Sequence, residues 1–169
     1  MSENTNFVIR AAVITLSDKG SKGEREDLSG RVIIDFLEET GGSVVTYEVI
    51  PDEVEILKAL LVKLTDSGEI NLILTTGGTG LSPRDITPEV TLSVMDKEIP
   101  GFAEAMRSVS LTKTPHAMLS RAVAVIRGET IIINLPGSPK AVRECLEVIA
   151  PALPHAIKKA AGDPDDCAR

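Results

Sequence analysis

The stretch that decides the fold is Ile70-Asn71-Leu72-Ile73-Leu74-Thr75-Thr76-Gly77-Gly78-Thr79-Gly80. Residues 70–75 form a short, almost continuous apolar run, which is typical of a strand buried on both faces of a sheet. A glycine-rich loop occupies residues 76–85, and Thr87-Pro88-Glu89 then opens a helix with proline at its favoured first position. A buried strand that leads through a loop into a helix is the repeating unit of a parallel sheet covered by helices.

The same alternation of strand and helix extends along the chain in both directions. Apolar or β-branched runs predict further strands at residues 7–16, 43–50, 122–126 and 130–135, the last two as a hairpin. Apolar residues at helical spacing predict helices at 28–40, 53–68, 102–111 and 142–149, a short turn or helix at 114–120, and a break near Pro151. We therefore expect one α/β domain over residues 1–169, with a parallel sheet, helices on both faces, and a flexible acidic tail at residues 163–169.

Composition and charge exclude several classes of function. The chain has no tryptophan, one tyrosine and three phenylalanines, so its core must be aliphatic and it lacks the ring faces on which single-stranded nucleic acid stacks. A net charge of −7 and the absence of a basic stripe exclude duplex binding as well. No signal sequence and no apolar run of membrane-spanning length is visible, so we expect no membrane partner and a cytoplasmic location.

Polar residues follow each predicted strand at the point where the strand ends. In open parallel sheets ligands bind at the carboxyl ends of the strands, so we expect these loops to line one site. The loops contain Ser17-Asp18, Pro51-Asp52, Thr75-Thr76-Gly77-Gly78-Thr79-Gly80 and Asn134-Leu135-Pro136-Gly137-Ser138. Their convergence is a stronger indication of a site than any one loop.

The glycines of the central loop let the backbone approach a ligand closely, and successive N–H groups in such a bend can hold an anion. A lone Gly-Gly-x-Gly fits a simple strand-to-helix turn equally well. The loop is not a Walker A motif, since no Gly-Lys-Ser/Thr follows, and it lacks the glycine spacing of a dinucleotide fingerprint. The segment Ser82-Pro83-Arg84-Asp85-Ile86-Thr87-Pro88 favours binding, because such a loop is costly to order without a function.

Two aspartates in these loops each have a structural and a functional interpretation. Asp52 begins Asp52-Glu53-Val54-Glu55, which resembles a capping box and explains the residue on local grounds alone. Asp85 could cap the helix that begins near Thr87, although Thr87 could cap it instead and leave Asp85 free. A capping carboxylate keeps one free oxygen, so both roles can coexist.

Neither the histidines nor the cysteines form a recognisable catalytic pattern. His116 follows Pro115 and His155 lies in the terminal helix, and both fit surface or core positions without an accompanying nucleophile. Cys145 fits a small core residue, and Cys167 is too distant from it for a zinc site or a disulfide framework. A reaction whose nucleophile is already an anion needs charge neutralisation and alignment rather than a strong base, and phosphate attacking phosphate is such a reaction.

The glycine-rich loop and the segment Arg84-Asp85-Ile86-Thr87-Pro88-Glu89 resemble the signature of the MogA/MoaB family of molybdenum-cofactor proteins. The resemblance covers roughly residues 8–162. It continues in Ile99-Pro100-Gly101-Phe102, in Thr114-Pro115-His116-Ala117-Met118-Leu119-Ser120-Arg121, and in Ile133-Asn134-Leu135-Pro136-Gly137-Ser138-Pro139-Lys140.

This resemblance implies a three-layer α/β/α domain with a mostly parallel sheet, a homotrimer, and a contact with the molybdate-insertion enzyme. It also implies molybdopterin adenylylation: the terminal phosphate of molybdopterin attacks the α-phosphate of ATP, and pyrophosphate leaves. Asp52 and Asp85 match the acidic pair of Mg²⁺-dependent catalysis, and Mg²⁺ prefers carboxylate and phosphate oxygens. The nucleotide and phosphate loop is matched by Thr75, Thr76, Gly77, Gly78, Thr79 and Gly80. The molybdopterin side is matched by Ser17, Asp18, Arg84, Ser110, Ser120, Asn134, Pro136, Gly137, Ser138 and Lys140, with Arg84 and Lys140 as cationic contacts.

Four rival functions remain at this stage. One is a non-catalytic protein of the same family that binds molybdopterin or a precursor. Molybdate-insertion enzymes and eukaryotic scaffolding fusions share this fold, but a chain of 169 residues has no room for their additional domains. A generic nucleotide-binding Rossmann enzyme is the most distant rival.

Overall fold

Six strands form one mixed sheet in the order β2-β1-β3-β6-β5-β4 in the computed structural model, which describes residues 8–164. The strands are β1 (Arg10–Leu16), β2 (Ser43–Ile50), β3 (Leu72–Thr76), β4 (Lys97–Glu98), β5 (Ala124–Arg127) and β6 (Thr130–Leu135). β2, β1, β3 and β6 are parallel, whereas β5 pairs antiparallel with both β6 and β4. The mostly parallel sheet and the hairpin are confirmed. The sequence pattern misses β4 because its two residues are charged and exposed.

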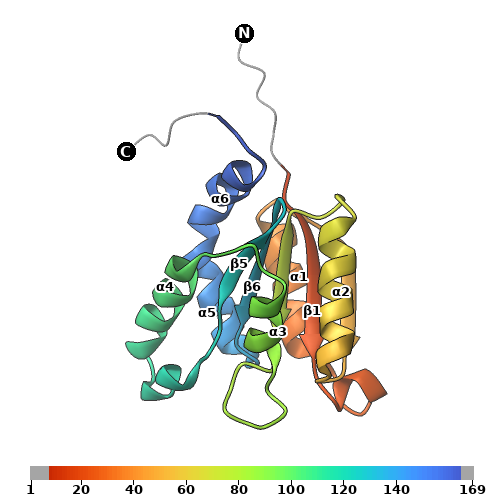
Figure 1. Ribbon diagram of the computed structural model, residues 1–169. Coiled ribbons are helices and arrows are strands. Elements are labelled where there is room, and N and C mark those ends of the chain that lie inside the picture. Colours follow the sequence, from red (N-terminus) through yellow and green to blue (C-terminus); the bar gives the residue numbers. More distant parts are fainter. Residues whose placement is uncertain (1–7, 165–169) are drawn as a thin grey trace.

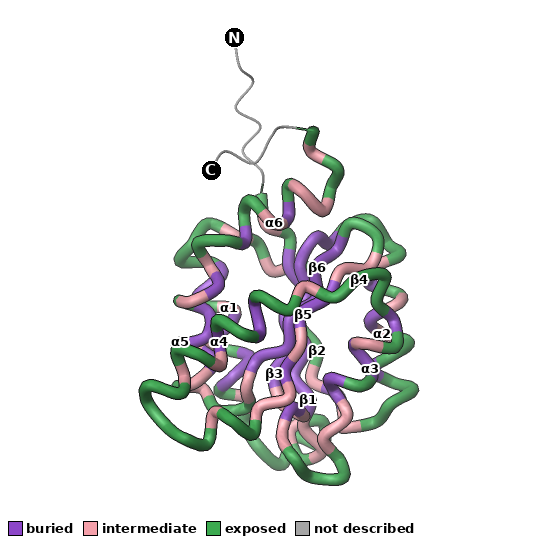
Figure 2. Tube along the Cα trace, turned by 60° about the vertical axis from the view of Figure 1, so that its left-hand side comes forward, coloured by how far each residue is buried: buried purple, intermediate pink, exposed green. Residues whose placement is uncertain are grey.

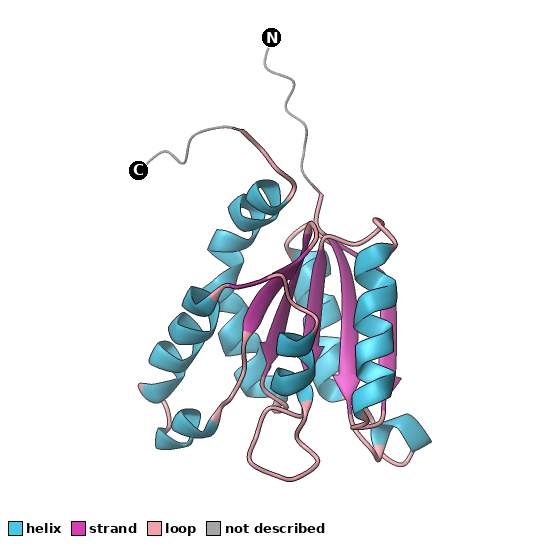
Figure 3. Ribbon diagram, viewed as in Figure 1, coloured by secondary structure: helices cyan, strands magenta, loops and turns pink. Residues whose placement is uncertain are grey.

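Helices cover both faces of the sheet, so the domain has three layers, as expected (Figures 1 and 3). Helices α2 and α3 pack on one face, and α1, α4, α5 and α6 pack on the other. They are α1 (Leu28–Glu39), α2 (Val54–Asp66), α3 (Thr87–Ser93), α4 (Pro100–Leu111), α5 (Pro139–Ile149) and α6 (Leu153–Ala160), with 3-10 turns η1 (Gly20–Lys22), η2 (Pro115–Leu119) and η3 (Ala150–Ala152). Turn η3 is the break expected near Pro151. Within residues 8–164, no helix has the length and hydrophobicity needed to span a bilayer.

The central strands β1, β3 and β6 are buried because each face of the sheet packs into its own aliphatic core (Figure 2). Side chains alternate between the faces of a strand. Ala11 and Val13 of β1 therefore join the core under α1 and α5, while Ala12 and Ile14 join the core under α2. Burial of each large aliphatic side chain stabilises the fold by about 1.5–3 kcal/mol. This packing fixes where the strands end, and hence where their loops begin.

The two cores are mainly aliphatic, as the composition predicts. Phe36 and Phe102 are the aromatic side chains buried in the core under α1, α4 and α5, and Tyr47 is 42% exposed. Cys145 is buried, which confirms it as a core residue. Phe7 and Cys167 lie outside the described residues.

The N-terminal ends of the helices show that one prediction, the capping of α2 by Asp52, is wrong. Helix α2 begins after Glu53, whose side chain makes no capping hydrogen bond, so Asp52 is not a helix cap. True side-chain caps occur at α1, where Asp27 accepts a hydrogen bond from the Gly30 N–H, and at α5, where Ser138 accepts one from the Ala141 N–H. The capping-box pattern fails at Asp52 because its carboxylate turns away from α2 toward the loop after β1.

Candidate functional site

The carboxyl ends of the parallel strands meet at one edge of the sheet, as their register requires. Leu16 of β1 pairs with Ile50 of β2, and Thr76 of β3 pairs with both Thr15 and Leu135. The loops after these strands therefore converge on what we call the carboxyl edge. The chain leaves β1 toward β2 on one side of the sheet and leaves β3 toward β4, β5 and β6 on the other. The topological switch point, at which open α/β sheets bind ligands, therefore lies between the ends of β1 and β3.

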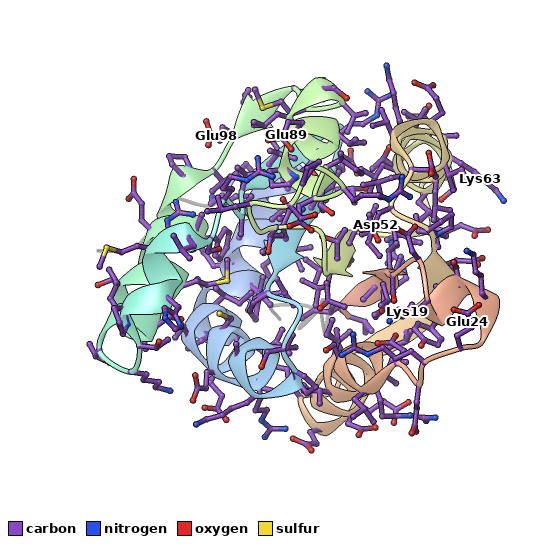
Figure 4. All side chains as sticks on the ribbon, turned by 90° about the horizontal axis from the view of Figure 1, so that it is seen from below. Lys19, Glu24, Asp52, Lys63, Glu89 and Glu98 are labelled. Atoms are coloured by element: carbon purple, nitrogen blue, oxygen red, sulfur yellow. The ribbon has the colours of Figure 1, made fainter. Side chains whose placement is uncertain are left out.

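Two aspartates flank the glycine bend (residues 77–80) at this edge. A β-carbon at Gly78 would lie 3.3 Å from Oδ1 of Asp52, and one at Gly80 would lie 2.8 Å from Oδ2 of Asp85. Both carboxylates thus contact the same short stretch of backbone. Figure 4 views the molecule from the carboxyl edge and places Asp52 toward its middle, away from the peripheral Lys63.

The glycine bend requires its glycines for two separate reasons. Gly77 and Gly78 have φ values of 90° and 67°, which L side chains rarely adopt. A β-carbon would also collide with the Leu16 carbonyl at Gly77 and with the Thr87 hydroxyl at Gly78. The bend is therefore closely packed against β1 and α3, and it is more than a simple turn.

The carboxylate of Asp52 lies in an unfavourable environment for a negative charge. Its pKa is raised above the ordinary value by burial and then by the negative charges of Asp18 and Asp85. The Asp18 N–H donates to Oδ2 of Asp52 at 3.2 Å, and the Asp52 N–H donates to Oδ1 of Asp18 at 3.1 Å. These reciprocal bonds join the loops after β1 and β2.

Arg84 forms ion pairs with two acidic side chains at this edge. Its guanidinium group donates to Asp18 at 2.7 Å and to Glu53 at 2.8 Å. The hydrogen bond from Arg84 lowers the pKa of Asp18, and these two carboxylates raise the pKa of Arg84. Arg84 and Asp18 thus pair with each other, although the sequence assigned both of them separately to the molybdopterin side. The ion pair is about half exposed and contributes little to stability.

Asp85 organises its own loop. Its Oδ2 accepts the Ser82 N–H at 2.9 Å, and its N–H donates to the Ser82 carbonyl at 2.9 Å. Helix α3 begins after Ile86 without a side-chain cap, so neither Asp85 nor Thr87 caps it, contrary to both local interpretations. The Thr87 hydroxyl instead donates to the Gly77 carbonyl at 2.9 Å, which joins the start and the end of the loop between these two residues.

A polar cavity of about 280 Å³ lies on the Gly77 side of the bend. The N-terminal ends of α1 and α5 border it through Leu28, Ser29 and Pro139. Helix N-termini carry partial positive charge, and Arg25 also lines the cavity. The carboxylates of Glu26 and Asp27 line it as well, and Asp27 already caps α1. Of the predicted residues, Ser17, Thr76, Gly77 and Gly137 line this cavity.

Asp27, which the sequence analysis did not single out, holds one wall of the polar cavity. Its carboxylate caps α1 and accepts hydroxyl hydrogen bonds from Thr15 and Tyr47, both at 2.6 Å. Burial and the charge of Asp27 raise the pKa of Tyr47 to about 12. The three residues lie 12 and 20 positions apart in sequence, so no local pattern could reveal the network.

An apolar cavity of about 290 Å³ lies on the Thr79 and Gly80 side of the bend. Helices α4 and α5 and turn η2 form its walls. Ser110, Ser120 and Pro136 line it, and His116 also borders it. Five of the ten residues predicted for the molybdopterin side thus line one or the other of these two cavities. Arg84 lines a separate hollow together with Asp52 and Glu53.

Several predicted residues line neither cavity. Asn134 is fully buried and its amide donates to the hydroxyls of Thr75 and Thr91, each at 3.0 Å, so Asn134 and Thr75 serve the interior of the sheet. Ser138 caps α5, and Lys140 is exposed on its first turn. His155 lies on α6, at the opposite end of the sheet from the bend (Figure 1).

The acidic pair fits a metal ion that arrives with phosphate better than a resident metal. In the described chain, no group of three or more histidine, cysteine, aspartate or glutamate side chains is arranged to hold an ion. Mg²⁺ is commonly held by one or two carboxylates while phosphate oxygens and waters complete its shell. Asp52 and Asp85, which border one bend, supply that number of carboxylates, and a cation would relieve the charge that raises the pKa of Asp52.

Residues 12–155 match the protein family described as the probable molybdopterin binding domain. The chain belongs to this family. It is 46% identical over 151 residues to the molybdopterin adenylyltransferase of Helicobacter pylori J99, covering 88% of this chain and 86% of that protein. It is 43% identical to the Escherichia coli K12 molybdopterin adenylyltransferase, covering 85% of this chain and 75% of that one. The crystal structure of the molybdopterin biosynthesis enzyme MoaB from Thermus thermophilus superposes with a TM-score of 0.87 at 50% identity, covering 93% of this chain and 99% of that one. The MogA/MoaB resemblance is thereby confirmed for the whole domain.

Proposed function

We propose that this member of the molybdopterin-binding family is a molybdopterin adenylyltransferase that uses Mg-ATP. The observation that carries the proposal is the placement of Asp52 and Asp85 on one glycine bend that separates a polar from an apolar cavity. The names of the relatives from Helicobacter pylori and Escherichia coli support it. The homotrimer, the contact with the molybdate-insertion enzyme and the cytoplasmic location are further proposals, and they rest on the family resemblance.

In this reaction an oxygen of the terminal phosphate of molybdopterin forms a bond to the α-phosphorus of ATP. The bond from that phosphorus to the oxygen bridging the α- and β-phosphates breaks, and pyrophosphate leaves. The nucleophile is an anion, so the site needs charge neutralisation and alignment and no strong base. His116 lines the apolar cavity and makes no hydrogen bond or ion pair with Asp52 or Asp85, which agrees with this requirement.

The residues of the chain would divide this work. Asp52 and Asp85 would hold Mg²⁺, which when bound offsets phosphate charge. The N–H groups of Gly78, Thr79 and Gly80 donate no hydrogen bond within residues 8–164, so they are available to phosphate oxygens. Arg25 supplies a positive charge at the polar cavity, and the apolar cavity suits a planar ring.

The deciding experiment measures pyrophosphate released from ATP in the presence of molybdopterin and Mg²⁺. We expect release by the wild type and a loss of about 100-fold or more in Asp85→Asn, since the substitution removes a metal-binding charge. The matched control is Asp96→Asn, because Asp96 also accepts one backbone N–H, from Gly128 at 2.6 Å, but lies beside the β5–β6 hairpin turn. Binding of molybdopterin by the wild type without pyrophosphate release would overturn the proposal and favour a non-catalytic binder.

A further inference from the structure

Arg121 makes an unusually complete set of contacts with the loop that contains Asp85. Its Nε donates to the Gly80 carbonyl at 2.7 Å, and one of its terminal nitrogens donates to the Asp85 carbonyl at 2.8 Å. The other terminal nitrogen forms an ion pair with Glu89 of α3. The Arg121 N–H also donates to the Thr79 carbonyl at 3.0 Å. A single residue thus binds both ends of the 80–85 loop and the helix that follows it.

The other contacts of this loop do not join its two ends. Arg84 ties the exposed part of the loop to Asp18 and Glu53, Thr87 bonds to Gly77 and Gly78, and the bonds between Ser82 and Asp85 lie inside the loop. Residues 81–84 are exposed. Within residues 8–164, the guanidinium group of Arg121 is the one side-chain group that hydrogen-bonds to both the Gly80 and the Asp85 carbonyls.

The contacts of Arg121 also set the direction of the free N–H groups. In a trans peptide the carbonyl and the following N–H point in opposite directions. The Thr79 and Gly80 carbonyls point toward Arg121, so the N–H groups of Gly80 and Leu81 point away from it. Within residues 8–164, neither of these N–H groups donates a hydrogen bond. They are available to an anion on the side of the bend that faces away from Arg121.

We propose that Arg121 is a positioning residue for adenylyl transfer, whose guanidinium group clamps the 80–85 loop so that Asp85 and the Gly80 and Leu81 N–H groups keep one arrangement. The inference rests on the proposed function, because it assigns Arg121 to the same site. Arg121 does not touch the reacting atoms. It acts through the carbonyls of Gly80 and Asp85, which only a planar group with several donors can bridge at once.

Arg127 provides a matched control at the opposite edge of the sheet. Its side chain is 28% exposed against 33% for Arg121, and it also binds a carbonyl and a carboxylate, those of Val94 and Asp66. Replacing either arginine by methionine removes a comparable set of contacts. Only the Arg121 substitution disturbs the glycine bend.

The test compares Arg121→Met, Arg121→Lys and Arg127→Met by thermal melting, by pyrophosphate release and by amide hydrogen exchange within residues 79–87. The exchange is measured at Ser82, Asp85 and Thr87, whose N–H groups donate hydrogen bonds. We expect Arg121→Met to speed exchange in this segment by tenfold or more and to lower turnover by about 100-fold, since small misplacements in a site are costly. Arg121→Lys should restore little, because an ammonium group cannot bridge two carbonyls. Free guanidinium ion, below denaturing concentrations, should restore part of the turnover of Arg121→Met. Arg127→Met should melt at least as early as Arg121→Met and keep wild-type exchange and turnover.

Unchanged exchange of residues 79–87 in Arg121→Met would overturn the inference. So would a turnover loss that merely follows the folded fraction, or equal losses in Arg127→Met. A wild type that releases no pyrophosphate would end the proposed function instead, and the exchange measurements would still decide whether Arg121 clamps the loop.

Discussion

The two edges of the sheet use similar residues for different purposes. At the amino edge, Gly68 and Gly128 adopt φ values of 71° and 57°, yet a β-carbon on either would meet nothing within 4 Å. At the carboxyl edge, a β-carbon on Gly77 or Gly78 would collide with neighbouring atoms. The first pair is needed only for backbone conformation, whereas the second is needed for conformation and for close approach. Close packing of a glycine bend against carboxylates is what distinguishes the candidate site from an ordinary turn.

Among the substitutions that test this difference between the two edges, Gly78→Ala should have the largest effect on stability and activity. The new methyl group would be strained at its φ and would collide with Thr87 beside Asp52, so we expect a loss of about 3 kcal/mol or more in unfolding free energy. Pyrophosphate release should fall below detection even under conditions where the protein stays folded. Urea denaturation and the pyrophosphate assay measure the two effects.

Gly128→Ala is the matched control for this substitution. It should cost about 1–2 kcal/mol from backbone strain alone and should leave turnover unchanged. If the two alanine variants lost equal stability and equal activity, the distinction between the edges would be wrong.

An intermediate effect is expected from Asp52→Ala, compared with Asp27→Ala at the same edge. Asp52 caps no helix and its negative charge is disfavoured by burial, so its loss should change stability by less than about 1 kcal/mol. Asp27 caps α1 and accepts two hydroxyl groups, so its loss should cost about 2–3 kcal/mol.

The effect of Asp52→Ala on activity should be much larger than its effect on stability, with turnover of folded protein falling about 100-fold. Thermal melting and pyrophosphate release separate the two properties. A lower melting temperature in Asp52→Ala with unchanged pyrophosphate release would show that Asp52 is structural.

The smallest effect concerns Tyr47 at alkaline pH. Its pKa is raised from 10.0 to about 12 in the folded protein, so between these values the native state binds more protons than the unfolded chain. The stability that Tyr47 contributes is therefore complete below pH 10 and is lost as the pH rises toward 12. Urea denaturation of Tyr47→Phe should show a shallower decline in stability over this range than the wild type. Parallel declines would mean that folding does not raise the pKa of Tyr47.

Most of the fold could be predicted from the sequence because strands, helices and turns leave patterns among neighbouring residues. Residues 70–75 are almost continuously apolar and are followed by glycines, and that pattern specifies a buried strand and a bend whatever surrounds them. The predictions failed where a charged side chain had a distant alternative. Asp52 sits in a good capping pattern, yet its carboxylate bonds to Asp18, which is 34 residues away.

The candidate site shows the same division. Composition, the strand-end loops and the family signature were enough to select Asp52, Asp85 and the glycine bend from the sequence. The tertiary structure decided that Arg84 pairs with Asp18 and that Asn134 is buried in the sheet. It also decided that Asp27 and Arg121 hold the walls and the loop of the site. These roles depend on hydrogen bonds between residues 12 to 66 positions apart, and such distances are set by how the strands pair and not by the order of neighbouring residues.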